Sequence, residues 1–173
     1  YMSDIITTVK GQAVASLSTD DTEEFTVAEL IKRVNILMKH ELKNAYIYLN
    51  VLMKIDENQI IHGNVNVLVQ VVNNMISNAI QAYAGKHDQN IQLEISNIDN
   101  YINISITDFA GGLPKEVQDR LFKEMITTKG KNGTGLGLYM SYSNIKAHFG
   151  GDITYQTEDG KGTTFNILIP MNK

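Results

Sequence analysis

DFAGGLPKEVQDRLFKEMITTKGKNGTGLGL, residues 108–138, is the stretch that decides the fold and the site. A strand-like alternation ends at Asp108, a glycine pair follows at 111–112, and a second glycine cluster at 133–137 opens a helix-like segment. Backbone N–H groups at a helix start attract phosphate, because that end carries about +0.5 of an elementary charge. Asp108 would repel phosphate and suits the exocyclic amine of adenine. Glycine pairs also form hairpin turns and helix caps, so the nucleotide pocket predicted here needs support from the rest of the chain.

The composition is that of one globular domain. The chain has 173 residues, of which 43% are hydrophobic and 20% charged, enough for one well-buried core. A formal net charge of -4 without a basic run argues against a nucleic-acid partner. The absence of cysteine excludes disulfides, zinc-thiolate sites and thiol catalysis. No apolar run approaches the roughly 20 residues of a membrane span, and no signal peptide is present. Because the chain starts at Tyr1, we expect it to be a piece of a longer protein.

Hydrophobic periodicity predicts a mixture of helices and strands. Thr26 and Glu29 form a T-x-x-E capping box before an amphipathic helix, and Asn64 caps a second, long helical pattern. Gly150 and Gly151 stop a third. The expected helices are 27–43, 65–84, 114–122 and 136–149; the expected strands are 46–51, 91–95, 102–106, 153–155 and 165–169, with a turn at 97–100 and a mobile lid at 123–133.

The second helix carries an unusual stripe of amides opposite its apolar face. Gln70, Asn74, Asn78 and Gln81 recur at helical spacing, where solvated faces usually carry charged residues. Asn is a poor helix former, and its side-chain carbonyl can ligate magnesium or orient a phosphate. A helix face that makes ordinary surface hydrogen bonds remains the alternative interpretation.

With these pieces in order, the chain resembles the ATP-binding catalytic domain of sensor histidine kinases, in the superfamily shared with DNA gyrase and mismatch-repair ATPases. The motifs are QVVNNMISNAIQA (70–82), DFAGGL (108–113), LFKEMITTK (121–129) and GTGLGL (133–138). The resemblance implies an α+β fold, a two-layer α/β sandwich of the Bergerat type, with a mixed, mainly antiparallel sheet and helices on one face. It places this ATP-binding domain at residues 25–173, after the end of an upstream dimerisation helix and a linker at residues 1–24.

The resemblance also implies a role for each motif residue. Asp108 would bind the adenine amine, with Thr163 beside it and Gly112 leaving room for the ring, and Asn78 would ligate magnesium. Asn74 and Lys129 would be the catalytic residues. The implied nucleotide-binding residues are Asn74, Asn78, Asp108, Gly112, Leu113, Thr127, Thr128, Lys129, Gly133, Thr134, Gly135, Leu136, Gly137, Leu138 and Thr163.

The function implied is transfer of the γ-phosphoryl group of magnesium-ATP to a histidine on a separate dimerisation domain, for relay to a response regulator. The parent would be a homodimer, and this domain would be cytoplasmic without touching a membrane itself. ATP-hydrolysing relatives and anti-sigma serine kinases carry Glu where Asn74 stands, so direct hydrolysis should be slow. The alternatives are an ATP-hydrolysing member of the superfamily and a catalytically silent ATP-binding regulatory module.

Several positions depart from the motif pattern. Ala110 replaces a frequent glycine, and Met125 and Ile126 stand where Phe is common. Gln81 occupies a position that is often basic, and Ala82 one that is often aromatic. Whether the next residue, Tyr83, contacts the nucleotide is left open.

The histidines are not expected to react or to bind metal. His40 lies in HELKN, which imitates a phosphoacceptor motif, but only about thirty residues separate it from the asparagine-rich motif. That distance is too short for the two-helix hairpin that carries the acceptor in the family. His62, His87 and His148 lack ligand-like spacing, so no zinc site is expected.

Overall fold

The computed structural model describes residues 23–113, 115, 118, 119 and 133–171, with only the backbone for 133–137. Its helices are α2 (Val27–Ala45), α3 (Val65–Ala82) and α5 (Gly133–Phe149). Its strands are β1 (Glu24–Thr26), β2 (Ile47–Met53), β3 (Ile60–His62), β4 (Gln89–Ile98), β5 (Tyr101–Asp108), β6 (Asp152–Glu158) and β7 (Gly162–Pro170). The expected helix 114–122 and lid 123–133 lie almost entirely outside the described residues, as does most of 1–24.

The main sheet has five strands in the order β2-β4-β5-β7-β6. The pairing of β2 with β4 is parallel, and the other pairings are antiparallel. The last residue of β5, Asp108, stands opposite Thr163 of β7 in the register. The sheet thus brings together two residues that the sequence separates by more than fifty positions.

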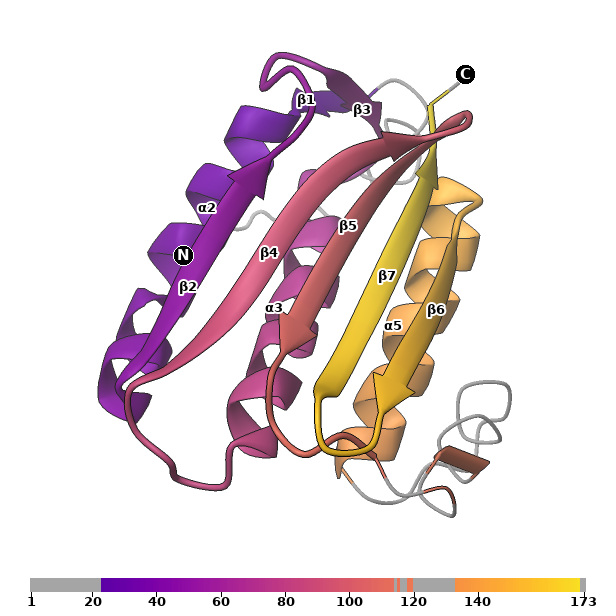
Figure 1. Ribbon diagram of the computed structural model, residues 1–173. Helices are drawn as coiled ribbons and strands as arrows, with labels where there is room; N and C mark the ends of the chain where they lie inside the picture. Colours follow the sequence, from indigo (N-terminus) through magenta and orange to yellow (C-terminus); the bar gives the residue numbers. More distant parts are fainter. Residues whose placement is uncertain (1–22, 114, 116–117, 120–132, 172–173) are drawn as a thin grey trace.

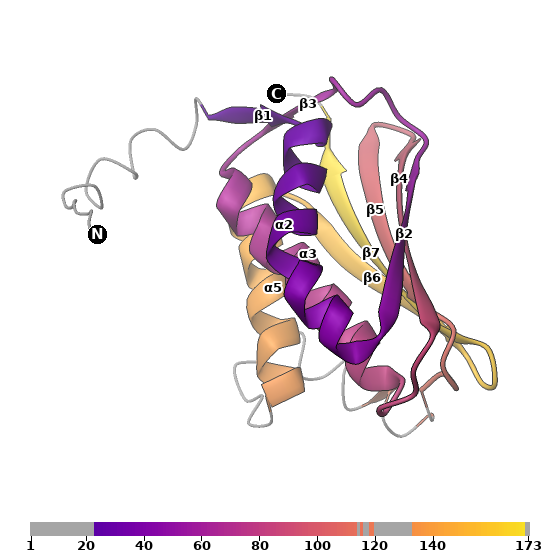
Figure 2. The ribbon, with the colours of Figure 1, turned by 90° about the vertical axis from the view of Figure 1, so that its left-hand side faces the viewer.

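The helices cover one face of this sheet. Figure 1 shows α2, α3 and α5 behind the strands, and Figure 2 shows none of them on the other side. The strand residues that face the helices are apolar at every second position, because successive side chains point to opposite faces. Ile91, Leu93 and Ile95 of β4 and Ile102, Ile104 and Ile106 of β5 are 0–1% exposed. The expected two-layer sandwich with a mixed, mainly antiparallel sheet is confirmed.

Local signals set the helix ends. The Thr26 hydroxyl accepts a hydrogen bond from the Glu29 N–H at 3.1 Å, and the Asn64 side chain accepts from the N–H groups of Asn66 and Val67. Helix α2 ends at Ala45, two residues after the predicted end, and the next residue, Tyr46, caps it with a φ of 56°. Gly150 ends α5 with a φ of +65°. Both predicted caps and the predicted glycine stop are confirmed.

Element ends differ from the sequence prediction by up to three residues, and three differences affect the architecture. Helix α5 begins at Gly133 and not at 136, so the glycine cluster forms its first turn. The β4–β5 turn is shorter than 97–100, because the strands reach Ile98 and Tyr101 and Asp99 adopts a φ of 54°. The two-stranded sheet β1-β3 was not predicted, since its three-residue strands carry too little periodicity to recognise.

Among the described residues, no helix is both long enough and apolar enough to span a membrane. His40 is exposed on α2, where its ring contacts Asn44 at 3.0 Å. Within the same residues no cluster of three or more His, Cys, Asp or Glu side chains could hold a metal ion.

Candidate functional site

A cavity of about 340 Å³ lies between the end of α3, the start of α5, the end of β5 and the start of β7. Figure 1 shows these four elements meeting at the lower end of the sheet. The size suits part of a nucleotide, such as its base and sugar. The cavity is lined by Asn78, Gln81, Ala82, Asp108, Ala110, Gly112, Leu113, Leu138, Thr163 and Phe165.

Asp108 is the acidic group of this cavity. It ends β5 and is only 5% exposed. One carboxylate oxygen, Oδ1, accepts a hydrogen bond from the Ala110 N–H at 3.1 Å, which orients the side chain locally. Burial raises the pKa of Asp108 above its ordinary 3.8, while backbone hydrogen bonds with Ala110 and Thr163 act in the opposite direction. The site therefore holds a desolvated carboxyl group, a strong acceptor for an amine or amide N–H.

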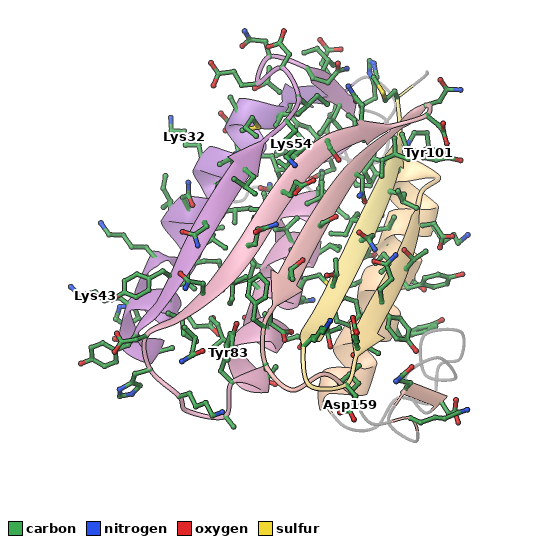
Figure 3. All side chains as sticks on the ribbon, viewed as in Figure 1. Lys32, Lys43, Lys54, Tyr83, Tyr101 and Asp159 are labelled. Atoms are coloured by element: carbon green, nitrogen blue, oxygen red, sulfur yellow. The ribbon has the colours of Figure 1, made fainter. Side chains whose placement is uncertain are left out.

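A hydroxyl network joins the loop after Asp108 to the β6–β7 hairpin. The Thr157 hydroxyl accepts from the Leu113 N–H at 2.9 Å and lies 3.0 Å from the Thr163 hydroxyl. The Gly160 N–H also donates to the Gly111 carbonyl at 2.8 Å. The β6–β7 turn, marked by Asp159 in Figure 3, therefore supports the wall of the cavity.

Two glycines allow backbones to approach closely at this wall. Gly112 has a φ of +82°, and a side-chain carbon there would overlap the carbonyl oxygen of Glu158. Gly162 has a φ of +138°, and a side-chain carbon there would overlap the carbonyl oxygen of Asp108. Gly112 was predicted to leave room for a ring; the structure adds a packing reason, because the neighbouring turn occupies the space next to its Cα.

The amide stripe of α3 divides into two parts. Asn78 and Gln81 line the cavity, together with Ala82. Asn74 is not among the lining residues; its amide donates to the Ser141 hydroxyl of α5 at 3.3 Å. Asn74 thus joins two helices in this structure, and a catalytic role for it stays a prediction.

The start of α5 supplies the other end of the site. Leu138 lines the cavity and is 1% exposed, whereas Gly133, Thr134, Gly135, Leu136 and Gly137 form the first turns of the helix. The N–H groups of a first turn lack partners within the helix. Thr127, Thr128 and Lys129 lie outside the described residues, so their predicted contacts with phosphate stay predictions.

Over residues 63–173 the chain matches the family described as histidine kinase-, DNA gyrase B-, and HSP90-like ATPase, more than half of its length. The chain belongs to this family. It is an ATP-binding domain of the histidine kinase-like ATPases, and the cavity at the end of its sheet is the candidate nucleotide site.

Named relatives of this ATPase domain are kinases. It is 38% identical over 105 residues to the sensor histidine kinase ZraS of Escherichia coli (strain K12), a match that covers 61% of this chain and 22% of ZraS. It is 28% identical over 170 residues to sporulation kinase C of Bacillus subtilis (strain 168), covering 98% of this chain and 37% of the relative. The chain therefore spans well under half the length of each of these relatives.

Solved structures share the fold of this ATPase domain. The catalytic domain of histidine kinase ThkA is similar with a TM-score of 0.71 and 25% identity, over 87% of this chain and 98% of that one. ThkA has also been solved in complex with the response regulator protein TrrA, with a TM-score of 0.69, 23% identity and coverage of 87% and 42%.

The structure brings together Asn78, Asp108 and Leu138, which the sequence analysis chose from three separate motifs. Gly112, Leu113 and Thr163 join them in the cavity wall. Sequence reasoning missed Phe165, whose place in the β7 alternation indicated only a core residue, and it gave Gln81, Ala82 and Ala110 no binding role. Gln81 and Ala82 could have been found from their spacing of three and four residues from Asn78 on the same helix. Ala110 lies inside the glycine motif 108–113, and Phe165 follows Thr163 by two residues on the same face of β7.

Proposed function

We propose that this domain binds magnesium-ATP in the cavity and supplies the γ-phosphoryl group to a histidine on a separate protein domain. The bond between the γ-phosphorus and the β,γ-bridging oxygen would break, and a bond to an imidazole nitrogen would form. The unprotonated nitrogen of a neutral imidazole would attack, ADP would leave with the electron pair, and the imidazole would then release its one N–H proton to solvent. Such transfer needs mainly positioning and charge stabilisation, so the lack of a strong base among the described wall residues is compatible with it.

The observation that supports this proposal best is the meeting of a buried carboxylate, an amide-bearing helix and a helix start in one cavity. Asp108 offers an acceptor for the adenine amine, and Thr163 lies directly opposite it in the sheet. The first turn of α5 offers backbone N–H groups and the positive end of a helix dipole for phosphate oxygens. Adenine would bind near the sheet and the phosphates near the start of α5.

Magnesium fits this site only together with the nucleotide. The Asn78 carbonyl oxygen is one of two amide oxygens, with that of Gln81, that α3 offers at the cavity, and amide oxygens suit this hard cation. Magnesium usually keeps several waters and shares the oxygens of substrate phosphates. When bound, magnesium would neutralise phosphate charge, and the Asn78 side chain would help to hold it.

The names of the relatives favour histidine kinase activity over direct ATP hydrolysis. An amide at Asn74 cannot take a proton from water, whereas the Glu expected there in ATP-hydrolysing relatives can. We infer that a dimerisation domain of the parent supplies the acceptor histidine and that a response regulator receives the phosphoryl group. The solved complex of ThkA with the response regulator protein TrrA supports this choice of partner. A cytoplasmic location stays a prediction.

A phosphotransfer assay tests this function. We expect the chain, mixed with magnesium, γ-labelled ATP and a supplied histidine-containing dimerisation domain, to label that domain with an acid-labile phosphate. The same domain with its histidine replaced should stay unlabelled, and a chelator should abolish the signal. Nucleotide binding without any labelling would instead indicate a silent ATP-binding module.

Hydrolysis of ATP by the chain alone should be slow, and its rate should not depend on the Asn74 side chain. We expect Asn74→Ala to leave the basal rate of phosphate release within about 2-fold of the original, since an amide contributes no general base. Gln70→Ala, on the exposed part of the same stripe, is the matched control. Substantial magnesium-dependent hydrolysis that disappears in Asn74→Ala but not in Gln70→Ala would contradict the kinase proposal and favour an ATPase.

A further inference from the structure

Tyr83 makes two hydrogen bonds that join three segments of the chain. It follows the last residue of α3 and is 2% exposed. Its hydroxyl donates to the carbonyl oxygen of Asn90 in β4 at 2.5 Å and accepts from the N–H of Phe109 at 2.7 Å. Figure 3 shows Tyr83 at the lower end of α3, beside the end of β5. One buried hydroxyl therefore connects α3, β4 and the residue that follows Asp108.

The register of the sheet shows where the Tyr83 hydroxyl lies relative to the β4–β5 ladder. The β4–β5 ladder pairs Ile91 with Asp108, and the next positions along the two strands are Asn90 and Phe109. β5 ends at Asp108, so the Tyr83 hydroxyl stands between the backbones one position beyond the last pair. At this position the Tyr83 hydroxyl therefore bridges the Asn90 carbonyl and the Phe109 N–H, where a ladder would have a direct backbone hydrogen bond. This hydroxyl links the two strands at the point where the chain turns into the glycine loop.

Two hydrogen bonds hold the chain on either side of the Asp108 carboxylate. Its carboxylate is held by the Ala110 N–H on one side of Phe109, and the Phe109 N–H is held by Tyr83. Tyr83 itself is not among the residues that line the cavity. Burial raises the pKa of Tyr83 above its ordinary 10.0, as does the nearby Asp108 charge, so the hydroxyl keeps its proton at neutral pH and stays a donor to Asn90.

We propose that Tyr83 is a positioning residue for base recognition: without touching the nucleotide, it sets the backbone at Phe109 so that Asp108 faces the exocyclic amine of adenine. This inference rests on the proposed adenine site. The consequence is specific, because loss of the hydroxyl should weaken the contact with the amine more than the contacts with sugar and phosphates.

The test compares ATP with purine riboside triphosphate, which lacks the exocyclic amine, by calorimetry on the complete chain. We expect the original chain to bind ATP at least about 10-fold more tightly than the amine-free analogue, as for a site with a buried partner for that amine. In Tyr83→Phe, ATP affinity should fall about 10-fold, while affinity for the analogue should change by less than about 2-fold. The preference for the amine should therefore nearly vanish.

The control variant is Tyr48→Phe, which removes a tyrosine hydroxyl from β2, where it lies 3.5 Å from Asp88 and far from the cavity in the sheet order. It should keep both affinities. If the original chain binds the two nucleotides equally well, the proposal that Asp108 binds the exocyclic amine of adenine is wrong. If it does distinguish them and Tyr83→Phe keeps the full preference, or loses both affinities equally, the positioning role is overturned.

A measurement on the unsubstituted chain covers the case in which Tyr83→Phe does not fold. We expect the Phe109 amide proton to exchange as slowly as those inside β5, because the Tyr83 hydroxyl accepts its hydrogen bond. The amide of Gly111, for which the described residues provide no acceptor, is the comparison within the same loop. Rapid exchange at Phe109 would show that the bridge is not maintained in solution and would overturn the inference.

Discussion

Asp108→Asn should reduce ATP affinity by about 100-fold, the largest binding effect expected for a single substitution in this domain. A hydrogen bond to a charged group contributes about 1.5–3 kcal/mol, and the asparagine amide can place a donor against the adenine amine. Calorimetric titration with ATP measures the change. Asp99→Asn, at the exposed β4–β5 turn at the other end of β5, is the matched control and should bind ATP normally.

The same substitution should not reduce the stability of the nucleotide-free domain. Burial raises the pKa of Asp108 in the folded state, so ionisation favours the unfolded chain as the pH rises above the ordinary value of 3.8. Asn removes this penalty while its side-chain oxygen can still accept from the Ala110 N–H. The variant should therefore be at least as stable as the original near pH 7, and any advantage should fade as the pH falls below 3.8. Equal ATP affinity would remove Asp108 from the adenine site; lower stability with weaker binding would indicate structural damage.

Gly162→Ala should be the most destabilising single change near the site. A side-chain carbon would overlap the Asp108 carbonyl oxygen and lie 3.0 Å from both the Asp108 carbonyl carbon and the Phe109 Cα, all of them backbone atoms that cannot turn aside. The φ of +138° adds strain for any residue with a side chain. We expect a loss of about 3 kcal/mol or more in the free energy of unfolding, measured by denaturant titration.

Gly160→Ala separates the two causes of this loss. Gly160 also has a positive φ, +82°, but a side-chain carbon there would meet nothing within 4 Å. This control should lose only about 1 kcal/mol, the cost of the left-handed backbone alone. Equal losses in the two variants would mean that backbone conformation, and not the close approach to Asp108, makes Gly162 necessary.

Much of the fold could be read from neighbours in the sequence. Thr26 and Asn64 mark helix starts, and Gly150 marks a helix end, because a cap is a contact between residues a few positions apart. The alternation in β4 and β5 placed their isoleucines in the core for the same local reason, the period of a strand. Asp108 could be named as a site residue because it lies at the end of a strand, immediately before a glycine-containing loop.

The sequence by itself therefore determined the helices, the strands of the main sheet with their buried faces, and six of the residues that line the cavity: Asn78, Asp108, Gly112, Leu113, Leu138 and Thr163. Only the tertiary structure decided that Asn74 contacts Ser141, that the Tyr83 hydroxyl joins Asn90 to Phe109, and that β1 pairs with β3. It also placed Gly162 against the Asp108 backbone. The physical reason is range: caps and periodicity act between close neighbours, whereas these contacts depend on how separate elements pack, which no local pattern encodes.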